Sequence, residues 1–304
     1  MVKWRIGSGP AGSGAVGAPT QGSVRLVNIH EPGSLEGRLE QWPVLATAGA
    51  LEVRLAETEA EVEQAQRLRY HVFYEEMAAV PSPEMRDARR DFDKFDEVCD
   101  HLLVVDRSAH DEDGQPLVVG TYRLTRDVDA ARAGGFYTAG EFDMSRMLKA
   151  FAGQKLLELG RSCVLKTYRN RTTTMQLLWK GLMAYVARFD IDLMFGCASF
   201  PGIDPDALAM PLSYLHHYAA MPEDVKVSAR PELYVSMARI PKDAIDQKEG
   251  MRTLPPLLKG YLRAGCRIGD GAVIDRQFST TDVFIYFPMS GLDPRYKSRF
   301  GLTS

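Results

Sequence analysis

The segment formed by residues 155–165, KLLELGRSCVL, constrains the fold most, because it is largely apolar yet carries two opposite charges three residues apart. A short run rich in leucine and valine predicts a buried strand, whereas glutamate and arginine are seldom buried without a partner. In a regular strand Glu158 and Arg161 would point to opposite faces, but a glycine such as Gly160 between them often marks a bulge. We therefore expect a bulged central strand whose two charges either line one cleft or form a structural ion pair.

Composition and charge predict a globular protein that does not bind nucleic acid. The chain has 304 residues, 45% of them hydrophobic and 25% charged, which is ample for a substantial core. A formal net charge of −3 gives no reason to expect a polyanionic partner. The four cysteines lack C-x-x-C spacing, which argues for reduced thiols and against a metal site or a disulfide framework. Without a long apolar segment or a signal-peptide core, we expect a cytoplasmic protein, at most peripheral on the inner membrane.

The chain divides into a leader and one folded domain. Residues 1–48 contain eight glycines and four prolines with little periodicity, which predicts a disordered or loosely attached leader. Residues 49–298 form the domain, in which order begins with a strand at residue 51, and residues of about 200–255 form a helical insertion. We expect strands at 51–55, 101–105, 116–124, 155–165, 191–196, 233–240, 272–275 and 282–287, and helices at 58–77, 172–189, 205–220 and 257–265.

Several charged side chains lie in apolar or aromatic surroundings and are candidates for a binding site. Arg69 lies on the apolar stripe of the first helix, so it either extends past the core or reaches into a site. Asp93 and Asp96 alternate with aromatic residues, which fits a solvated loop or a pocket for a cation. Arg169 and Arg171 precede a helix that begins near Thr172, and basic groups at a helix N-terminus form an anion site.

The expected order of elements resembles the GNAT acyltransferases, an α/β (α+β) fold with a mixed central sheet, a bulged central strand and flanking helices. The later segments LLKGYLRAG (257–265) and GAVIDRQFSTTDVF (271–284) look like the ornithine N-acyltransferases that make lyso-ornithine lipid. Five further features stand in the order and spacing seen in acyl-homoserine-lactone synthases: Arg69-x-x-x-Phe73, Asp93-x-x-Asp96, Gly120-x-x-Arg123-Leu124, Phe142 and Glu158-x-x-Arg161.

The resemblance implies an enzyme that transfers a 3-hydroxyacyl group from acyl carrier protein to the α-amine of L-ornithine. An acyl-homoserine-lactone synthase or another amino-acid N-acyltransferase is the alternative within the same class. A non-catalytic lipid-binding or lytic protein is the alternative of another class.

The donor is inferred from the loop after the bulged strand. GNAT enzymes that use acetyl-CoA usually carry a glycine-rich loop there to hold a pyrophosphate, whereas this chain has YRNRTT at residues 168–173. The phosphopantetheine arm of acyl carrier protein presents one phosphate, for which Arg169, Arg171 and Thr172 would suffice. The resemblance thus implies acyl-phosphopantetheine on acyl carrier protein as donor and no permanently bound cofactor.

Aminolysis of a thioester requires that the α-amine lose a proton, and Glu158 is the candidate general base or water-positioning group. Backbone N–H groups freed at the bulge are candidates for stabilising the tetrahedral oxyanion. The resemblance places Tyr261 as the acid that protonates the leaving thiolate, although it would also fit as a helix tyrosine packed on the sheet.

The acceptor-binding set follows from charge and from the resemblance. Asp93 and Asp96 are candidates for the side-chain ammonium of ornithine, and Arg69 or Arg161 for its carboxylate. The resemblance adds Phe73, Arg123 and Phe142 to the residues expected to contact substrate.

Overall fold

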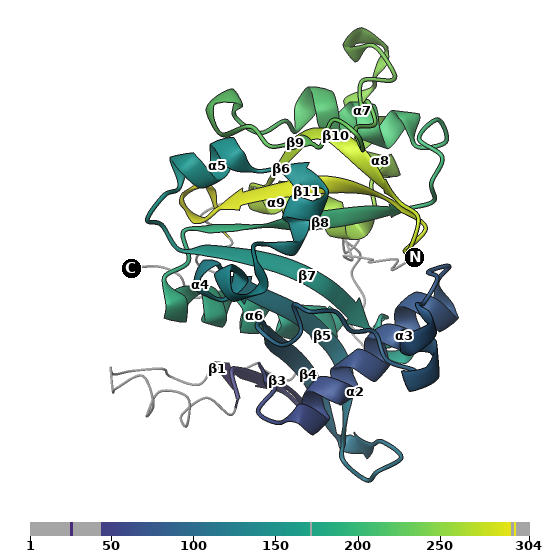
Figure 1. The fold of residues 1–304 in the computed structure, drawn as a ribbon, viewed down its shortest axis with the longest axis vertical. Helices are drawn as coiled ribbons and strands as arrows, with labels where there is room; N and C mark the ends of the chain where they lie inside the picture. Colours follow the sequence, from purple (N-terminus) through teal and green to yellow (C-terminus); the bar gives the residue numbers. More distant parts are fainter. Residues whose placement is uncertain (1–24, 27–43, 171, 293–294, 296–304) are drawn as a thin grey trace, which may run out of the picture.

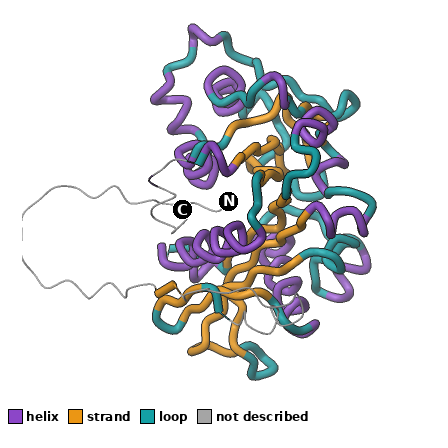
Figure 2. The backbone as a smooth tube through the Cα atoms, turned by 90° about the vertical axis from the view of Figure 1, so that its left-hand side faces the viewer, coloured by secondary structure: helices purple, strands orange, loops and turns teal. Residues whose placement is uncertain are grey.

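The computed structural model describes residues 25–26, 44–170, 172–292 and 295, and its centre is a mixed sheet with helices on both faces (Figures 1 and 2). The strands lie in the order β1-β2-β3-β4-β5-β7-β8-β11-β10-β9-β6. Neighbouring strands are antiparallel, except that β7 with β8 and β9 with β10 are parallel. The strands are β1 (Arg25–Leu26), β2 (Ala46–Ala48), β3 (Leu51–Leu55), β4 (Asp100–His110), β5 (Pro116–Arg126), β6 (Phe142–Asp143), β7 (Leu156–Val164), β8 (Leu193–Pro201), β9 (Ser228–Ala229), β10 (Arg267–Asp275) and β11 (Thr280–Pro288).

The two longest helices cover opposite faces of this sheet. Helix α6 contributes Leu178 and Leu182 to the main core, whereas α2 packs Ala65 and Leu68 into a separate cluster in front of β4 and β5 (Figure 1). Thr58 is the N-cap of helix α2, and its hydroxyl accepts a hydrogen bond from the N–H of Glu61, as the sequence predicts. The helices are α2 (Glu59–Tyr70), the π-helix η1 (His71–Glu76), α3 (Pro83–Ala88), α4 (Asp127–Ala130), α5 (Ser145–Ala150), α6 (Thr172–Phe189), α7 (Ala209–Tyr218), α8 (Gln247–Thr253) and α9 (Pro256–Ala264), with short 3₁₀ turns η2 (Ala131–Ala133), η3 (Tyr137–Gly140), η4 (Lys166–Tyr168), η5 (Glu223–Val225), η6 (Lys242–Ala244) and η7 (Met289–Gly291).

The central strand β7 carries the bulge that its glycine predicts. Along β5, Thr121 pairs with Cys163 and Arg123 pairs with Gly160, so two steps on β5 correspond to three on β7. The extra residue changes the phase of the side chains. Arg161 within the bulge has a φ of +50°, a backbone conformation that is uncommon for a residue other than glycine. Strain of this kind is often found at functional sites.

At the bulge, β7 and β8 separate and the sheet opens. Strand β7 pairs with β8 only from Leu156 with Leu193 to Leu159 with Gly196. After that point β8 continues along β11. Backbone groups of β7 that follow this short seam therefore face a gap between two diverging strands, where a substrate can approach them.

Gly196 is required at the point where the strands separate. A Cβ atom built there would lie 2.3 Å from the carbonyl oxygen of Leu159, closer than any real contact. We expect Gly196→Ala to lower the free energy of unfolding by about 1–3 kcal/mol because the crowded strands must move apart. Gly140→Ala is the matched control, since no atom lies within 4 Å of its added Cβ. Urea unfolding of both variants tests this, and equal midpoints would contradict it.

The start of the sheet differs from the prediction that order begins at residue 51. Strand β2 lies within the segment assigned to the leader and pairs with β3, and Leu45 just before it is 2% exposed. The short strand β1 pairs with β2 in turn. Leu45 and Ala46 belong to the same core as Leu178 and Leu182 of α6, a contact between distant segments that local periodicity does not reveal. The rest of the predicted leader, residues 1–24 and 27–43, lies outside the described residues.

The prediction of a strand near residues 233–240 is wrong. Helices α7 and α8 occupy the insertion, and strand β9 precedes the predicted position. Within this segment Val235 forms one isolated antiparallel β-bridge, with Ala272 of β10. Strand β10 is also irregular between Ile268 and Ala272 in its pairing with β11. Across the described residues, no helix combines the length and apolar character that a membrane span needs.

Candidate active site

A cavity of about 450 Å³ lies at the opening between β7 and β8. Residues from β5, β7, β8, η1, α9 and both ends of the β10–β11 turn line it. Five residues singled out from the sequence are among them: Phe73, Arg123, Glu158, Arg161 and Tyr261. The bulge thus brings Glu158 and Arg161 to one cavity, as expected from the position of the glycine between them.

Glu158 does not form the structural ion pair that was the alternative interpretation. Its side chain is 4% exposed, and its two oxygens accept hydrogen bonds from the backbone N–H groups of Thr138 (2.7 Å) and Tyr137 (3.1 Å). Burial raises the pKa of this carboxyl above its usual value, although the two N–H donors and nearby Arg123 oppose the shift. A buried carboxylate that is oriented by backbone donors is well suited to accept a proton.

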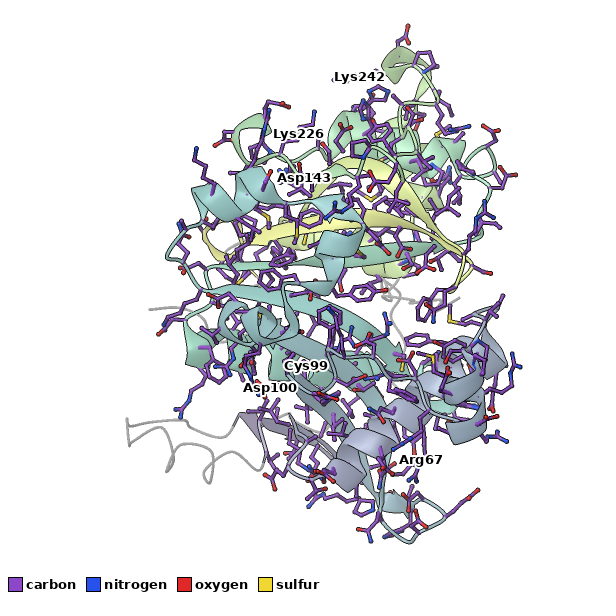
Figure 3. All side chains as sticks on the ribbon, in the orientation of Figure 1. Arg67, Cys99, Asp100, Asp143, Lys226 and Lys242 are labelled. Atoms are coloured by element: carbon purple, nitrogen blue, oxygen red, sulfur yellow. The ribbon has the colours of Figure 1, made fainter. Side chains whose placement is uncertain are left out.

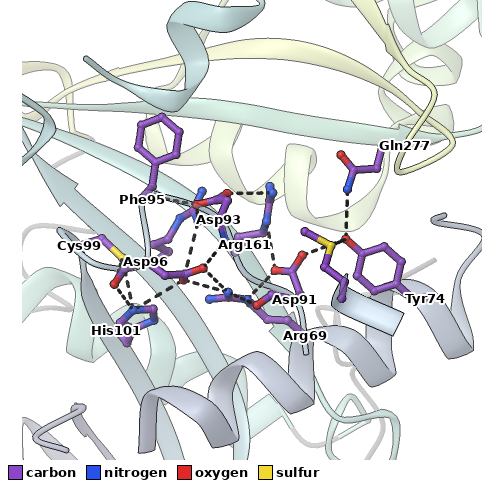
Figure 4. Close-up of polar contacts among 12 residues, drawn as sticks. Arg69, Tyr74, Asp91, Asp93, Phe95, Asp96, Cys99, His101, Arg161 and Gln277 are labelled. Carbon is purple, nitrogen blue, oxygen red and sulfur yellow. Dashed lines mark hydrogen bonds and ion pairs between the residues drawn. The ribbon is translucent and has the colours of Figure 1, made fainter. Parts of the chain in front are cut away.

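An ion-pair network lies beside the cavity (Figure 4). Arg69 is fully buried and donates to Asp91 Oδ2 at 2.7 Å and to Asp96 Oδ2 at 2.9 Å. Tyr74 donates a further hydrogen bond to Asp91 Oδ1 at 2.9 Å. Burial alone would raise the pKa of Asp91, but Arg161 and Arg69 hold it below its usual value. Arg69 is therefore part of a charged cluster and does not extend past the core to solvent.

The same network extends to the cavity wall through two more arginines. Arg161 lies 3.3 Å from Asp91 Oδ2 through its Nε and 3.2 Å from Asp93 Oδ2 through its Nη2. Arg123 donates to Asp93 Oδ1 at 2.7 Å. Three guanidinium groups thus balance the three carboxylates of Asp91, Asp93 and Asp96 within the protein.

Two aromatic rings flank the guanidinium of Arg161. It lies 4.9 Å from the ring centre of Tyr137 and 4.6 Å from that of Phe278, which restricts its orientation. Phe278 also meets Phe73 edge to face, with ring centres 5.5 Å apart. Phe73 belongs to the π-helical segment η1, which continues the predicted first helix beyond α2. These aromatic contacts hold the charged end of Arg161 at the cavity wall.

Tyr261 lies on α9, which has Pro255 at its N-cap and Pro256 as its first residue and is capped at its C-terminus by Gly265, whose φ is +112°. Its hydroxyl shares a hydrogen bond of 2.7 Å with that of Tyr122 on β5. Burial, reinforced by Tyr122, raises the pKa of Tyr261 well above its usual value, so the hydroxyl stays protonated at neutral pH. A protonated hydroxyl in the cavity wall is a suitable proton donor.

Other residues predicted for the site lie elsewhere or are engaged. Phe142 is fully buried against Phe284, with ring centres 5.7 Å apart, and does not line the cavity. Arg169 pairs with Glu76 at 2.6 Å and donates to the carbonyl oxygen of Val164 at 2.7 Å. Helix α6 begins at Thr172, as predicted, whereas the neighbouring predicted residue, Arg171, lies outside the described residues.

Sequence reasoning missed several groups that complete the site. Tyr137 and Thr138 orient Glu158 through backbone N–H groups, which leave no trace in side-chain identity. Tyr122 stands within an apolar strand pattern and shows its role only beside Tyr261. Asp91 was available as a signal, since it begins the same acidic and aromatic run as Asp93.

Comparison with known proteins assigns this chain to a family. A model described as an acetyltransferase (GNAT) domain matches residues 68–180. The L-ornithine N(alpha)-acyltransferase of Rhizobium meliloti (strain 1021) is 48% identical over 258 residues, which cover 85% of this chain and 86% of that one. The protein of the same name from Rhodobacter capsulatus is 38% identical over 246 residues, covering 81% and 93%.

Among solved structures, an N-acyl amino acid synthase from uncultured soil microbes aligns with a TM-score of 0.44 and 10% identity, over 84% of this chain and 98% of that one. A superposition at this TM-score carries no information on function. The family is shown by the sequence identity to the relatives, which extends over most of both chains, together with the GNAT match. The chain is an acyltransferase with a GNAT fold and belongs to the L-ornithine N(alpha)-acyltransferase family.

Proposed function

We propose that the protein transfers a 3-hydroxyacyl group from acyl carrier protein to the α-amine of L-ornithine and so produces lyso-ornithine lipid. The observation that carries the proposal is the position of Glu158, buried in the cavity where β7 leaves β8 and held there by two backbone N–H groups. The names of the relatives support ornithine as acceptor.

The reaction needs one base and one acid on the same cavity. The α-amine loses a proton to Glu158, directly or through a water molecule, and its nitrogen attacks the thioester carbon. Backbone N–H groups beyond the seam, from Gly160 onward, face the oxyanion that forms. When the tetrahedral intermediate collapses, the C–S bond breaks and the thiolate takes a proton from Tyr261. The products are an amide and a free thiol.

The cavity and the adjacent loop support a long acyl group on a carrier protein. Phe200, Leu208, Leu254 and Leu257 give the cavity an apolar lining that suits a hydrocarbon chain. The loop that follows β7 lacks a glycine-rich run, and Lys166 is exposed on it, in the turn η4 that leads toward α6. A basic loop at a helix N-terminus suits one phosphate and the acidic surface of a carrier protein.

The test is a reaction of the purified protein with ornithine and either a 3-hydroxyacyl carrier protein or the matching CoA thioester. We expect thiol release that depends on ornithine, an N-acylated product by mass spectrometry, and a higher kcat/KM with the carrier protein. Lysine, glutamine and S-adenosylmethionine serve as rival acceptors. A product formed from one of them and not from ornithine would refute ornithine as the acceptor. A higher kcat/KM with the CoA thioester would refute acyl carrier protein as the donor.

A further inference from the structure

We propose that Glu141 and Asp282 bind the side-chain ammonium of the acceptor and thereby select a diamino acid. This inference rests on the proposed function, because it assigns one part of the ornithine site. It differs from the prediction made from the sequence, in which Asp93 and Asp96 receive that ammonium. Those two carboxylates are already paired with arginines of the protein.

The two acids come from segments far apart in the chain. Asp282 lies on β11 opposite Ser199 of β8 and lines the cavity, whereas Glu141 immediately precedes β6. The carboxylate oxygens of both and the Sγ of Cys197 all lie within 4.8 Å of one another. The pairing of β8 with β11 brings Cys197 and Asp282 together, and the segment before β6 adds Glu141.

The pair lacks a cation of its own. Within the described residues neither Glu141 nor Asp282 forms an ion pair. Asp282 is 6% exposed, and its Oδ1 accepts no hydrogen bond from the part of the chain that the structure describes. Arg161 acts on both acids from a distance, but it is paired with Asp91 and Asp93. A buried carboxylate oxygen without a partner is costly, so a positively charged ligand is the expected complement.

The electrostatics agree with this geometry. Burial, followed by the effect of Asp282, raises the pKa of Glu141 to about 7. Burial also raises the pKa of Asp282 to about 6, although the hydroxyl groups of Thr280 and Ser199 and nearby Arg161 oppose the shift and Asp275 adds to it. Both acids are thus difficult to ionise without a cation beside them. An ammonium group placed between them would favour their ionised forms.

Thr138 connects this pair to the proposed base. Its N–H donates to Glu158 at 2.7 Å, and its hydroxyl lies 3.8 Å from the Sγ of Cys197, which in turn donates to Glu141 Oε2 at 3.4 Å. One carboxylate therefore stands on each side of a single threonine. This arrangement matches one molecule with two amines, its α-nitrogen at Glu158 and its side-chain nitrogen at the acidic pair.

A metal ion is the less suitable occupant. Cys197 donates its thiol hydrogen to Glu141, and burial together with Glu141 raises the pKa of this thiol well above its usual value. A thiol that stays protonated is a poor metal ligand. The remaining two carboxylates suit an ammonium, which needs acceptors and no fixed coordination geometry.

The experiment compares L-ornithine with L-norvaline, which has the same carbon chain without the side-chain amine. We expect the parent protein to favour ornithine in kcat/KM by about 10²–10⁴. Asp282→Asn should reduce this preference by about 10² or more, mainly through a higher KM for ornithine, and Glu141→Gln should act in the same direction. Asp143→Asn is the control. It removes the same charge from an exposed aspartate on β6, two residues after Glu141 (Figure 3).

The outcomes separate the two proposals. If the parent acylates ornithine and norvaline equally well, or if Asp282→Asn keeps the full preference, the inference is wrong while the proposed function stands. If the parent acylates neither with any donor, the proposed function fails and the inference with it. Should Asp282→Asn not fold, the parent comparison and Glu141→Gln still decide. A requirement for a divalent ion that EDTA removes would assign the cluster to a metal and overturn the inference.

Discussion

Replacing Glu158 with glutamine is expected to lower kcat by about 10²–10⁴, the usual contribution of general-base catalysis, with little change in donor KM. Glutamine keeps the size of the side chain but cannot accept the proton of the amine. Because burial raises the pKa of Glu158, kcat of the parent should fall as the pH drops through that raised value, and the residual activity of the variant should not follow this profile.

Turnover and thermal unfolding measured on the same sample separate catalysis from folding. Glutamine offers one acceptor oxygen to the two N–H donors of Tyr137 and Thr138, so stability should fall by about 1–3 kcal/mol. Glu97→Gln, at an exposed position, is the control and should change neither quantity. A Glu158→Gln protein that turns over like the parent would remove this residue from the mechanism.

The largest loss of stability is expected from Arg69→Leu, at about 3–5 kcal/mol. This substitution leaves the buried carboxylates of Asp91 and Asp96 without the cation that pairs with both of them. Arg67→Leu, two residues earlier on the same helix, is a matched control (Figure 3). Its side chain is 47% exposed and pairs with Glu63 at the surface, so the loss should be about 0–1 kcal/mol.

Equilibrium unfolding in urea at neutral pH measures both arginine variants. The difference between the two losses of stability is the informative quantity, because both substitutions replace arginine with leucine on the same helix and so change helix propensity equally. If the two variants lose similar stability, the network around Arg69 contributes no more than a surface ion pair. The interpretation that this network supports Arg123 and Arg161 at the cavity wall would then be wrong.

The sequence predicted the features that depend on local chemistry. A glycine between two charges was enough to predict the bulge of β7. Thr58 and its following glutamates predicted the start of α2. For Arg69, Asp93 and Asp96 the sequence left open whether they face solvent or a site, because their pairing depends on how α2 lies on the sheet, which no local pattern contains.

The remaining parts of the site depend on contacts between distant segments. Glu141 and Asp282 meet because the segment before β6 lies against the paired strands β8 and β11. The backbone donors of Tyr137 and Thr138 are independent of side-chain type. Such features arise from topology and backbone geometry, so they are found only once the sheet is assembled.

The short pairing of β7 with β8 also has a mechanical consequence. Four paired positions join two halves of the sheet: the first half runs from β1 to β7 in the strand order, and the second from β8 to β6. The segment that orients Glu158 begins near the first half, after α4, and continues into β6, which pairs with β9 at the outer edge of the second half. This segment therefore connects the two halves across the short β7–β8 pairing. A change in the angle between the halves would move the backbone donors of Glu158 and change the width of the cavity at the same time, so loading of a bulky donor and alignment of the amine are geometrically linked.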